Sequence, residues 1–562
     1  MEFDAKARTA AQVLVDQLVI QGVRHVFCVP GESYLPVLDA LLDRDIQVTV
    51  CRQEAGAAIM AEAVGKATGR PGVCFVTRGP GASNAAHGVH IAQQSSSPMI
   101  LFVGQVDRSS RGRDAWQELD YAAVFGSMTK WAGEIDDPAR MSELVARAFH
   151  VAMAGQPGPV VLALPHDVLA APADCLDAPR AEPVEASPGA PEMEALRAVL
   201  AGANDPFLLL GGSRWDEAAR EAVTRFAERF ALPVATGFRR LPLFDPLHPQ
   251  YAGDLGLSPN PALLARVKAA DLVISIGGRL SDVTTQGYTL FDVPAPKSKL
   301  VHVFPGPEEL GRVWQPHLAI NATPTRFATA LEALSPAGTP AWRGAAEAAH
   351  AEYLAWSEAA TPQPGGVNLG EIMVWLREHL PEDAILTNGA GNFAAWVGRF
   401  YRVRRFGGHV APNSGSMGYG VPAAVAMQRL YPGRRIVALS GDGDFLMNGQ
   451  EFATAVQYDL PVIILVADNS SYGTIRMHQE RDYPGRVVAT DLKNPDFAAY
   501  ARAFGGFGAT VERTADFGPA FEAAVASGQP AILHLKIDTE ALSPGQTLSA
   551  IRAAALGKGQ GA

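Results

Sequence analysis

The sequence predicts an α/β protein built from three doubly wound parallel-sheet domains. Short apolar runs alternate with amphipathic stretches along almost the whole chain, which is the pattern of successive βαβ units. Two Pro- and Ala-rich segments, "APRAEPVEASPGAPE" and "AATPQPGG", interrupt this alternation and have the composition of linkers. At 562 residues the chain is also too long for a single hydrophobic core. We therefore expect three domains of similar size.

The predicted domains are residues 1–172, 190–335 and 366–545, followed by a C-terminal tail over 546–562. The first contains the strand-like runs "HVFCVP", "GVCFVT" and "PVVLALP", the second "PFLLLGG" and "DLVISIGG", and the third "RRIVALSG" and "LPVIILVAD". The first and third blocks both open with an amphipathic helix before their first strand. This common opening suggests that the two domains are related.

The composition excludes several classes of protein. The formal net charge is −11, and the Arg-rich stretch at 402–405 is too short for a nucleic-acid interface, so we expect no nucleic-acid partner. Four cysteines without a CxxC pair are typical of reduced thiols in a cytoplasmic protein. No basic leader precedes an apolar run, and no run approaches the ~18 residues of a membrane span. We expect a cytoplasmic protein without a membrane partner.

Polar, glycine-rich turns follow two successive predicted strands of the third domain. "RRIVALS" leads into Gly441-Asp442-Gly443-Asp444, and "PVIILVAD" leads into Asn469, with one helix between them. A right-handed crossover places both carboxyl ends at one sheet edge, where α/β proteins bind ligands. Carboxylate, amide and carbonyl oxygens suit Mg²⁺, and the glycines allow backbone N–H groups to approach a phosphate. The alternative is two ordinary turns with N-caps. No GxxxxGK[ST] motif supports a P-loop nucleotide.

The Gly441-Asp442-Gly443 turn followed by Asn469 resembles the GDG…N motif of thiamine diphosphate (ThDP) enzymes. The resemblance covers nearly the whole chain, in the order pyrimidine-binding, central and diphosphate-binding domain. The segments "NPDF", "GSMGYGVPAA" and "GRDAWQELD" are similar to the acetolactate synthase and pyruvate oxidase branch. The resemblance implies that Asp442, Asn469 and the backbone carbonyl of Ser471 hold Mg²⁺.

The resemblance also implies which turns hold the cofactor. Backbone in several glycine-rich turns would face the diphosphate, and Met417 would wedge under the cofactor and force its two rings into a V. Packing in the core is the alternative for Met417. The residues implied for cofactor binding, besides Glu54 discussed next, are Gly391, Asn392, Gly415, Met417, Gly441, Gly443, Asp444 and Gly473.

Glu54 stands between a predicted strand and a small-residue helix in "TVCRQEAGAAIMAEAVGKATG". A carboxylate at this place favours a helix N-terminus, which is the plainer interpretation. The resemblance implies instead that this acid bonds the pyrimidine N1′ and promotes the imino tautomer that activates the cofactor. Because the family builds each site from two chains, it also implies a homodimer or homotetramer with active sites at the subunit interface.

The predicted acceptor pocket departs from acetolactate synthases at four positions. Val283 stands where those enzymes hold a 2-oxoacid carboxylate with an arginine, and Arg279 lies one turn earlier. His478 replaces a tryptophan, His166 a lysine, and Glu32 a small residue. Loss of a bidentate carboxylate clamp weakens recognition of that acid. The departures indicate a second substrate other than the usual 2-oxoacid.

Further candidate catalytic residues lie in the first and third domains. Glu32 is either a general acid/base or a helix N-cap. Gln105 matches a place near the cofactor, and His478 stands at the place of a tryptophan that favours larger acceptors. His87 and His90 either reach the site or lie satisfied in the core. The sequence leaves FAD in the central domain open, because "GGSRW" and "GGRLSD" follow strands but neither is a GxGxxG.

Three functions follow from the resemblance. The first is ThDP- and Mg²⁺-dependent action on a 2-oxoacid, with decarboxylation and with or without carboligation. The second is a lyase or ligase that acts on a 2-hydroxyketone or a 2-hydroxyacyl-CoA without decarboxylation. The third is a catalytically silent ThDP-binding subunit, against which the intact Glu54, Asp442 and Asn469 argue.

Overall fold

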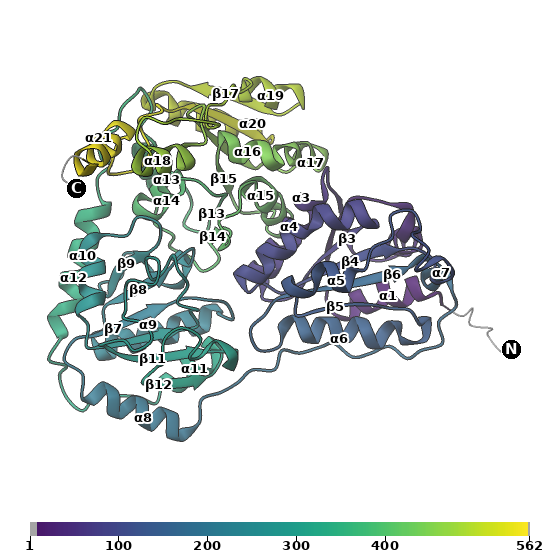
Figure 1. Ribbon diagram of the computed structural model, residues 1–562, viewed down its shortest axis with the longest axis horizontal. Helices are drawn as coiled ribbons and strands as arrows, with labels where there is room; N and C mark the ends of the chain where they lie inside the picture. The colour runs from purple at the N-terminus through teal and green to yellow at the C-terminus, as the bar shows by residue number, and fades with distance from the viewer. Residues whose placement is uncertain (1–7, 560–562) are drawn as a thin grey trace. The chain divides into compact units, whose positions relative to one another are not determined.

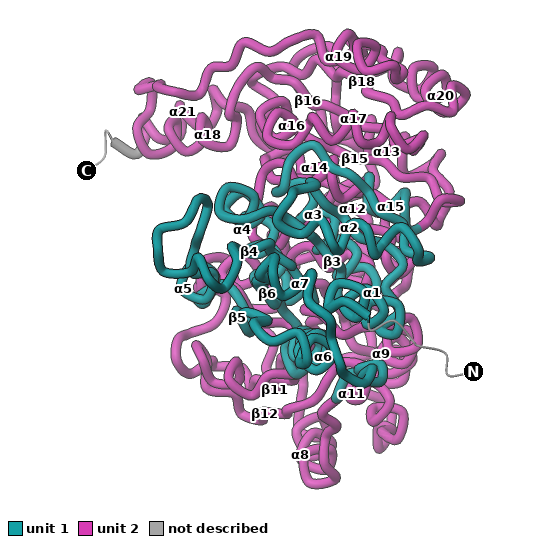
Figure 2. The backbone as a smooth tube through the Cα atoms, turned by 90° about the vertical axis from the view of Figure 1, so that its right-hand side faces the viewer, with its two compact units in different colours: residues 1–184, 425–430 teal, residues 185–424, 431–562 magenta. Residues whose placement is uncertain are grey.

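The computed structural model describes residues 8–559, which belong to two compact units shown in Figure 2. The first unit comprises residues 1–184 and 425–430, and the second comprises 185–424 and 431–562. Within the described residues lie three six-stranded sheets, one in the first unit and two in the second. Their paired strands are parallel. The predicted architecture of three parallel-sheet α/β domains is confirmed, and the domain boundaries stay predictions.

The first sheet has the strand order β2-β1-β3-β4-β6-β5. Its inner strands are continuous apolar runs because helices cover both faces. Helices α1, α2, α6 and α7 share a core with one face, and α3 and α4 contact the strands outside that core. Figure 1 shows α6 on one side of the strands and α3 and α4 on the other. The strands are β1 (His25–Cys28), β2 (Gln47–Val50), β3 (Gly72–Val76), β4 (Met99–Gln105), β5 (Trp131–Glu134) and β6 (Pro159–Pro165). The helices are α1 (Ala10–Ile20), α2 (Leu35–Leu42), α3 (Glu54–Thr68), α4 (Gly79–Ser95), α5 (Tyr121–Phe125), α6 (Met141–Met153) and α7 (His166–Ala170).

Small residues let α3 and α4 lie against each other. A Cβ added at Gly88 of α4 would come within 2.4 Å of the Ala58 Cβ of α3, so only glycine allows this approach. Gln53 caps the N-terminus of α3, and Gly69 ends it in the left-handed conformation with φ +68°. The small residues of "EAGAAIMAEA" thus allow α3 to pack closely against α4.

The central sheet has the order β12-β11-β10-β7-β8-β9 and belongs to the second unit. Helices α8, α9 and α11 share a core with one face, α10 packs on the other, and α12 contacts β9. The strands are β7 (Pro206–Leu210), β8 (Val234–Gly237), β9 (Tyr251–Leu255), β10 (Leu272–Ile276), β11 (Lys299–Phe304) and β12 (Leu318–Asn321). The helices are α8 (Ala190–Ala201), α9 (Glu217–Phe230), α10 (Pro261–Ala269), α11 (Pro324–Leu331) and α12 (Arg343–Ser357).

The third sheet has the order β14-β13-β15-β16-β18-β17, which repeats the strand order of the first sheet position by position. Helices α13, α14 and α20 share a core with one face, and α16 and α19 contact its strands outside that core. The strands are β13 (Ile385–Asn388), β14 (His409–Val410), β15 (Ile436–Gly441), β16 (Ile463–Asp468), β17 (Phe507–Val511) and β18 (Ala531–Lys536). The helices are α13 (Leu369–His379), α14 (Ala394–Phe400), α15 (Gly420–Leu430), α16 (Asp442–Asn448), α17 (Phe452–Gln457), α18 (Gly473–Asp482), α19 (Phe497–Ala503) and α20 (Phe517–Ser527).

Most of the segment expected as a C-terminal tail forms α21 (Leu548–Gly559), which packs against α18. Arg552 of α21 donates Nε and Nη2 to the two carboxylate oxygens of Glu480 on α18, at 2.7 and 2.5 Å. Hydrogen bonding to Arg552 lowers the pKa of Glu480 to about 2. This ion pair helps to hold α21 against α18.

Neither membrane spans nor disulfides are found among the described residues. No helix among residues 8–559 is both long enough and apolar enough to cross a bilayer. The four cysteines are free thiols, and three of them are buried: Cys28, Cys51 and Cys74.

Candidate cofactor and metal site

Two neighbouring strands of the third sheet bring the predicted metal ligands together. Gly441, the last residue of β15, pairs with Ala467 of β16 in the parallel ladder, so Asp442 and Asn469 follow at adjacent strand ends. The backbone N–H of Ser471 lies 3.2 Å from Oδ2 of Asp442 and 3.2 Å from Oδ1 of Asn469. The structure therefore gathers all three predicted ligands at one point on the sheet edge.

This cluster fits a hard divalent cation. Asp442 is buried at the first position of α16, and burial raises the pKa of its carboxyl to about 6. Keeping such a carboxylate charged without a partner is unfavourable, and a cation would offset that cost. No group of three His, Cys, Asp or Glu side chains among residues 8–559 could hold a metal. The oxygen set of one carboxylate, one amide and one carbonyl suits Mg²⁺ rather than a softer metal.

Asp444 joins the loops around this edge. Its Oδ1 accepts hydrogen bonds from the N–H groups of Ala390 at 3.1 Å and Gly418 at 2.8 Å. A Cβ at Gly389 would come within 2.0 Å of this oxygen, which explains the glycine there. The Asp444 side chain therefore points into the protein and fixes the turns after β13 and β14. Contact of its backbone with a diphosphate stays a prediction.

The predicted cofactor residues of the remaining turns lie around the same edge. Asn392 donates its backbone N–H to Oγ1 of Thr474 at 3.1 Å and accepts from that hydroxyl at 3.0 Å, which ties the turn after β13 to the start of α18. The ring of Tyr472 covers Gly443, where a Cβ would come within 2.6 Å of it. The ring of Phe393 likewise covers Gly391 and Gly441. Glycines in the turns over 389–392, 441–444 and 469–473 thus allow three main-chain segments and the rings of Tyr472 and Phe393 to pack closely.

Met417 lies half-buried in the turn between β14 and α15. It is flanked by exposed Gly415 at φ +66° and buried Gly418 at φ +79°, both in the left-handed region that favours glycine. The partial exposure of Met417 does not match a fully packed core residue.

Glu54 lies in the first unit, at the first position of α3. The cap of this helix is Gln53, whose side-chain oxygen accepts from the N–H groups of Ala55 and Gly56. Capping therefore does not require Glu54. Its Oε2 instead accepts from Nδ2 of Asn84 on α4 at 2.9 Å. The carboxylate is half-buried at the carboxyl edge of the first sheet.

Comparisons with known proteins agree with this arrangement of domains. Family models of the thiamine pyrophosphate enzymes match the chain three times: the N-terminal TPP binding domain at 8–124, the central domain at 193–331 and the C-terminal TPP binding domain at 389–535. The acetolactate synthase isozyme 2 large subunit of Escherichia coli is 32% identical over 94% of this chain and 95% of its own length. The chain belongs to the thiamine pyrophosphate enzymes.

Other members of this family are similar over most of their length. An acetolactate synthase large subunit of Parasynechococcus marenigrum is 32% identical, over 88% of this chain and 82% of its own length. A probable acetolactate synthase large subunit of Methanocaldococcus jannaschii is 30% identical, over 94% and 92% respectively. The predicted resemblance to the acetolactate synthase branch of ThDP enzymes is confirmed.

Glu32, a candidate catalytic residue of this ThDP enzyme, forms an ion pair. Its Oε1 accepts from Nη2 of Arg78 at 2.5 Å, and the Glu32 side chain is 63% exposed. The cap position of the short 3₁₀ turn here is Gly31, so the alternative that Glu32 is an N-cap is wrong. Trp116 lies 5.6 Å from the Arg78 guanidinium carbon, measured to the ring centre.

The other polar candidates have local partners. Gln105 is buried, donates to the carbonyl of Leu119 at 3.0 Å and accepts from the N–H of Val106 at 3.0 Å, so its amide serves the main chain. Nδ1 of His478 lies 2.6 Å from Nη2 of Arg481, a neighbour on α18. Both side chains remain predictions as catalytic residues.

The histidines of the first unit differ in burial. His87 is half-buried, and burial followed by the neighbouring His90 lowers its pKa. His90 is exposed, so the core alternative is wrong for this residue. His166 is 46% exposed at the start of α7, 3.6 Å from a carboxylate oxygen of Asp107.

Arg279 of the central domain already has an acidic partner. Its Nε lies 3.5 Å from Oε2 of the buried Glu309, which also pairs with Arg312 at 3.1 Å. Val283 is half-buried nearby in sequence. Arg279 is therefore held by Glu309 within the central domain. It is not free to replace the missing carboxylate clamp.

The glycines considered for FAD have another explanation. The strand order of the central sheet reverses between β7 and β10, where a dinucleotide would lie. A Gly-Gly pair follows each of these two strands. A Cβ at Gly212 would come within 1.6 Å of the Gly277 carbonyl oxygen, and the Trp215 indole donates to the carbonyl of Gly211 at 2.7 Å. The glycines allow two loops to touch, and they give FAD no support.

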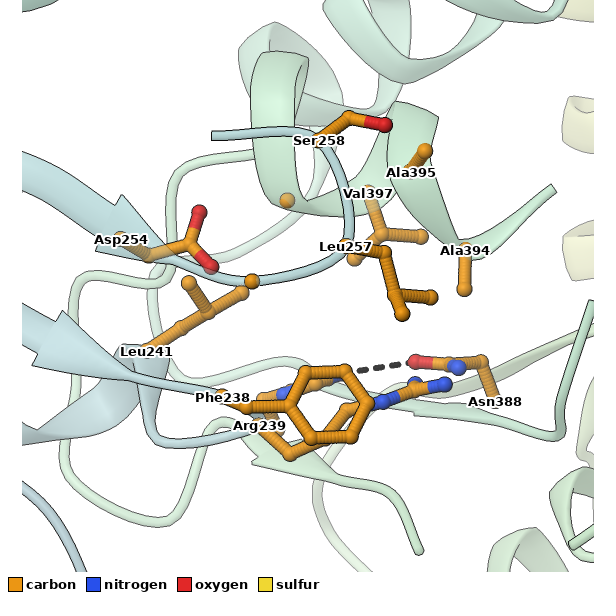
Figure 3. A pocket seen from close by; sticks show the side chains of 13 residues that line it. Phe238, Arg239, Leu241, Asp254, Leu257, Ser258, Asn388, Ala394, Ala395 and Val397 are labelled. Carbon is orange, nitrogen blue, oxygen red and sulfur yellow. Dashed lines mark hydrogen bonds between the residues drawn. The ribbon is translucent and has the colours of Figure 1, made fainter. Parts of the chain in front are cut away.

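A small cavity lies between the central and third sheets inside the second unit (Figure 3). It measures about 30 Å³ and is bordered by Arg239, Asp254 and Asn388. Nη2 of the buried Arg239 donates to the carbonyl of Gly389 at 3.0 Å, just before the predicted diphosphate turn. Burial raises the pKa of Asp254 to about 7, against the attraction of Arg239.

Sequence reasoning missed three polar residues that support the predicted site. Asn84 bonds Glu54, Arg239 bonds the Gly389 carbonyl, and Asn494 bonds Asp442 at 2.7 Å. Asn494 stands in "NPDF", one of the segments that resemble the acetolactate synthase and pyruvate oxidase branch. Each of the three comes from a different element than its partner, so no spacing along the chain could pair them.

Proposed function

We propose that the protein is a ThDP- and Mg²⁺-dependent enzyme that acts on a 2-oxoacid, by decarboxylation with or without carboligation to an acceptor carbonyl. The observation that carries the proposal is the convergence of Asp442 and Asn469 on the Ser471 amide, at an edge surrounded by glycine turns. It occurs in a chain that matches the ThDP family in all three domains and is similar to proteins named acetolactate synthase.

Each part of the chain has a defined task in this proposal. Asp442, Asn469 and the carbonyl of Ser471 bind Mg²⁺, and the turns containing Gly391, Asn392, Gly441, Gly443 and Gly473 bind the diphosphate. ThDP, when bound, supplies an electron sink for the charge left as carbon dioxide departs. Glu54 holds a proton at the pyrimidine ring, and Asn84 orients its carboxylate.

The acceptor differs in the proposal from a second copy of the usual 2-oxoacid. Val283 cannot clamp a carboxylate, and Arg279 is engaged by Glu309. Glu32, held by Arg78 and exposed, serves as the general acid or base toward the substrate. His478, exposed in part on α18, contacts the acceptor, and Gln105 shapes the loop that ends at Leu119.

The assembly in the proposal is a homodimer or homotetramer in the cytoplasm, in which each site takes Glu54 from one chain and the diphosphate turns from another. The support is the family membership and the placement of the two residue sets in different domains. Molar mass in solution, measured by light scattering with and without ThDP, tests this part.

A substrate panel tests the reaction. Purified protein is given ThDP, Mg²⁺ and a series of 2-oxoacids, from pyruvate to bulkier acids, with and without an aldehyde acceptor. Carbon dioxide release with an aldehyde or a 2-hydroxyketone as product supports the proposal. Aldehyde from an acyloin without carbon dioxide from any acid indicates the non-decarboxylating lyase instead. Tight ThDP binding without any product indicates a silent subunit.

A further inference from the structure

A hydrogen-bond chain runs behind the predicted metal ligand Asp442. Nδ2 of Asn494 donates to Oδ2 of Asp442 at 2.7 Å and to Oδ1 of Asp468 at 2.8 Å. An amide NH₂ group has two hydrogens, so Asn494 donates one to each of the two carboxylates. Asn494 comes from the loop between α18 and α19, whereas the two acids follow or end neighbouring strands of the third sheet.

The far end of the chain is fixed by three further groups. Oδ2 of Asp468 accepts from Nε2 of His534 at 2.7 Å and from Nζ of Lys536 at 2.8 Å. The N–H of Phe497 donates to Nδ1 of His534 at 3.3 Å, which leaves the imidazole proton on Nε2, facing Asp468. The backbone N–H of Ser470 donates to Oδ1 of Asp468 at 2.9 Å. Asp468 is therefore held in one orientation.

The Asn494 amide separates two buried acids that would otherwise repel each other. Asp442 and Asp468 are both almost fully buried, and their carboxylates share the same amide nitrogen. Like charges at this spacing destabilise the ionised forms of both acids unless a donor lies between them. Because Asp468 is anchored by β18 through His534 and Lys536, the amide can in turn fix the rotation of the Asp442 carboxylate.

We infer that Asn494 is a positioning residue for the cation site: it transmits the fixed orientation of Asp468 to the Asp442 carboxylate and so sets the Mg²⁺ affinity. The inference rests on the proposed function, in which Asp442 binds the cation. Partners that orient a metal-bound carboxylate from behind typically contribute 10- to 100-fold in metal affinity. Asn494 therefore affects cation binding and not the reaction itself, because it orients the Asp442 carboxylate.

The test measures cofactor binding without turnover. ThDP is titrated into metal-free protein in a calorimeter at a series of fixed Mg²⁺ concentrations, for the natural chain and for Asn494→Ala. The variant is expected to need about 10- to 100-fold more Mg²⁺ for half-maximal ThDP binding and to recover the natural ThDP affinity at saturating Mg²⁺. The melting temperature without Mg²⁺ and ThDP is recorded for both proteins.

A matched control separates positioning from stability. Asn321→Ala removes an asparagine side chain that donates to the carbonyl of Phe304 at 3.0 Å in the central domain. This variant is expected to keep the natural Mg²⁺ dependence whatever its melting temperature. If Asn494→Ala is insoluble, Asn494→Ser takes its place, since a hydroxyl carries one hydrogen and cannot donate to both carboxylates.

The outcomes distinguish this inference from the proposed function. If the natural chain shows no Mg²⁺-dependent ThDP binding, the proposed function fails. If the natural chain binds but the Asn494 variant has an unchanged Mg²⁺ half-saturation, the inference fails and the proposed function stands. A lower melting temperature with unchanged Mg²⁺ dependence likewise overturns the inference, because it marks Asn494 as merely structural.

Discussion

The first and third sheets have the same strand order, yet their carboxyl edges carry different chemistry. After β13 and β14 the third sheet presents the glycine turn at 389–392 and the Met417 turn, and after β15 and β16 it presents Asp442 and Asn469. These are small residues and hard oxygen ligands. An edge of this kind can hold a diphosphate and its cation.

At three of the four equivalent positions the first sheet presents charged side chains. Glu32 follows β1, Glu54 follows β2 and Arg78 follows β3, while the position after β4 is the apolar Val106. Glu54 and Arg78 flank the start of α4, from which Asn84 bonds Glu54. The same strand order thus carries small residues and metal ligands in the third sheet, and two acids and an arginine in the first.

The difference leads to opposite expectations for variants at equivalent places. Substitutions at the edge of the third sheet should impair cofactor binding, and substitutions at the edge of the first sheet should impair turnover with the cofactor still bound. The four variants are Asp442→Ala and Asn494→Ala on the side of the third sheet, and Glu54→Gln and Asn84→Ala at the edge of the first sheet. If their effects were exchanged between the two sheets, this division would be wrong.

The largest expected effect is at Glu54. Glu54→Gln removes the ionisable proton but keeps the size and the bond from Asn84, so kcat should fall about 10²- to 10⁴-fold. ThDP affinity, measured by calorimetry, should stay within a few-fold of the natural chain. Glu182→Gln, at an exposed glutamate in the same unit, is the matched control and should leave both quantities unchanged. Full turnover by the Glu54 variant would remove the activating acid from the proposal.

The second variant acts at the anchor. Asp442→Ala deletes a carboxylate of the cation site, so Mg²⁺-dependent ThDP binding should weaken more than about 100-fold, which exceeds the loss expected for a supporting residue. The same calorimetric titration measures it. Asp516→Ala, an exposed aspartate of the same domain, should bind normally. Unaltered Mg²⁺ dependence in the Asp442 variant would mean that the cation, if bound, lies elsewhere.

The third variant sharpens the division at the first edge. Asn84→Ala leaves Glu54 without its amide donor, and loss of a hydrogen bond to a charged group should lower kcat about tenfold. ThDP affinity should stay within a few-fold of the natural chain, because Asn84 bonds the acid and not the predicted diphosphate turns. Ser83→Ala, at the exposed neighbour of Asn84 on α4, is the control. An unchanged kcat would show that Asn84 does not act through Glu54.

The sequence was sufficient to predict the strands, the parallel sheets and the convergence of Asp442 with Asn469. Buried parallel strands must be continuous apolar runs, and a right-handed crossover forces the ends of adjacent strands onto one edge. The turn glycines were equally predictable, since close approach of main chains excludes a Cβ, as at Gly389. These features depend on backbone geometry that repeats from protein to protein.

The supporting side chains could not be predicted, because they depend on tertiary contacts. Asn494 lies 52 residues beyond Asp442, and Arg239 lies 150 residues before Gly389. The same limit applies to Gln105, whose burial suited a site residue but whose amide is bonded to the main chain on both sides. The C-terminal helix was also unforeseen, since it is held by tertiary contacts, among them the ion pair between Arg552 and Glu480 and the hydrogen bonds from Ser549 to Glu540.

The smallest expected effect is on the stability of the contact between the central domain and the turn at Gly389, which Arg239 makes. The first sheet has no such neighbouring domain among the described residues of its own unit. Asp254 borders the cavity beside Arg239, and burial raises its pKa to about 7 in the folded protein. In the unfolded chain its pKa is about 3.9. Between these values the folded state binds more protons, so stability falls as the pH rises from about 4 to 7 and stays reduced above.

Asp254→Asn removes this penalty, because an amide does not ionise. The variant should be more stable than the natural chain at pH 8, by about 1 to 2 kcal/mol after allowance for the lost attraction to Arg239, and should show a smaller advantage at pH 5. Melting temperatures at one scan rate across this pH range measure the difference, with Asp516→Asn as the exposed control. If the advantage were instead the same at every pH, the pKa of Asp254 would not be raised in the folded protein. Asp254 would then have no effect on Arg239 or on the turn at Gly389 that Arg239 holds.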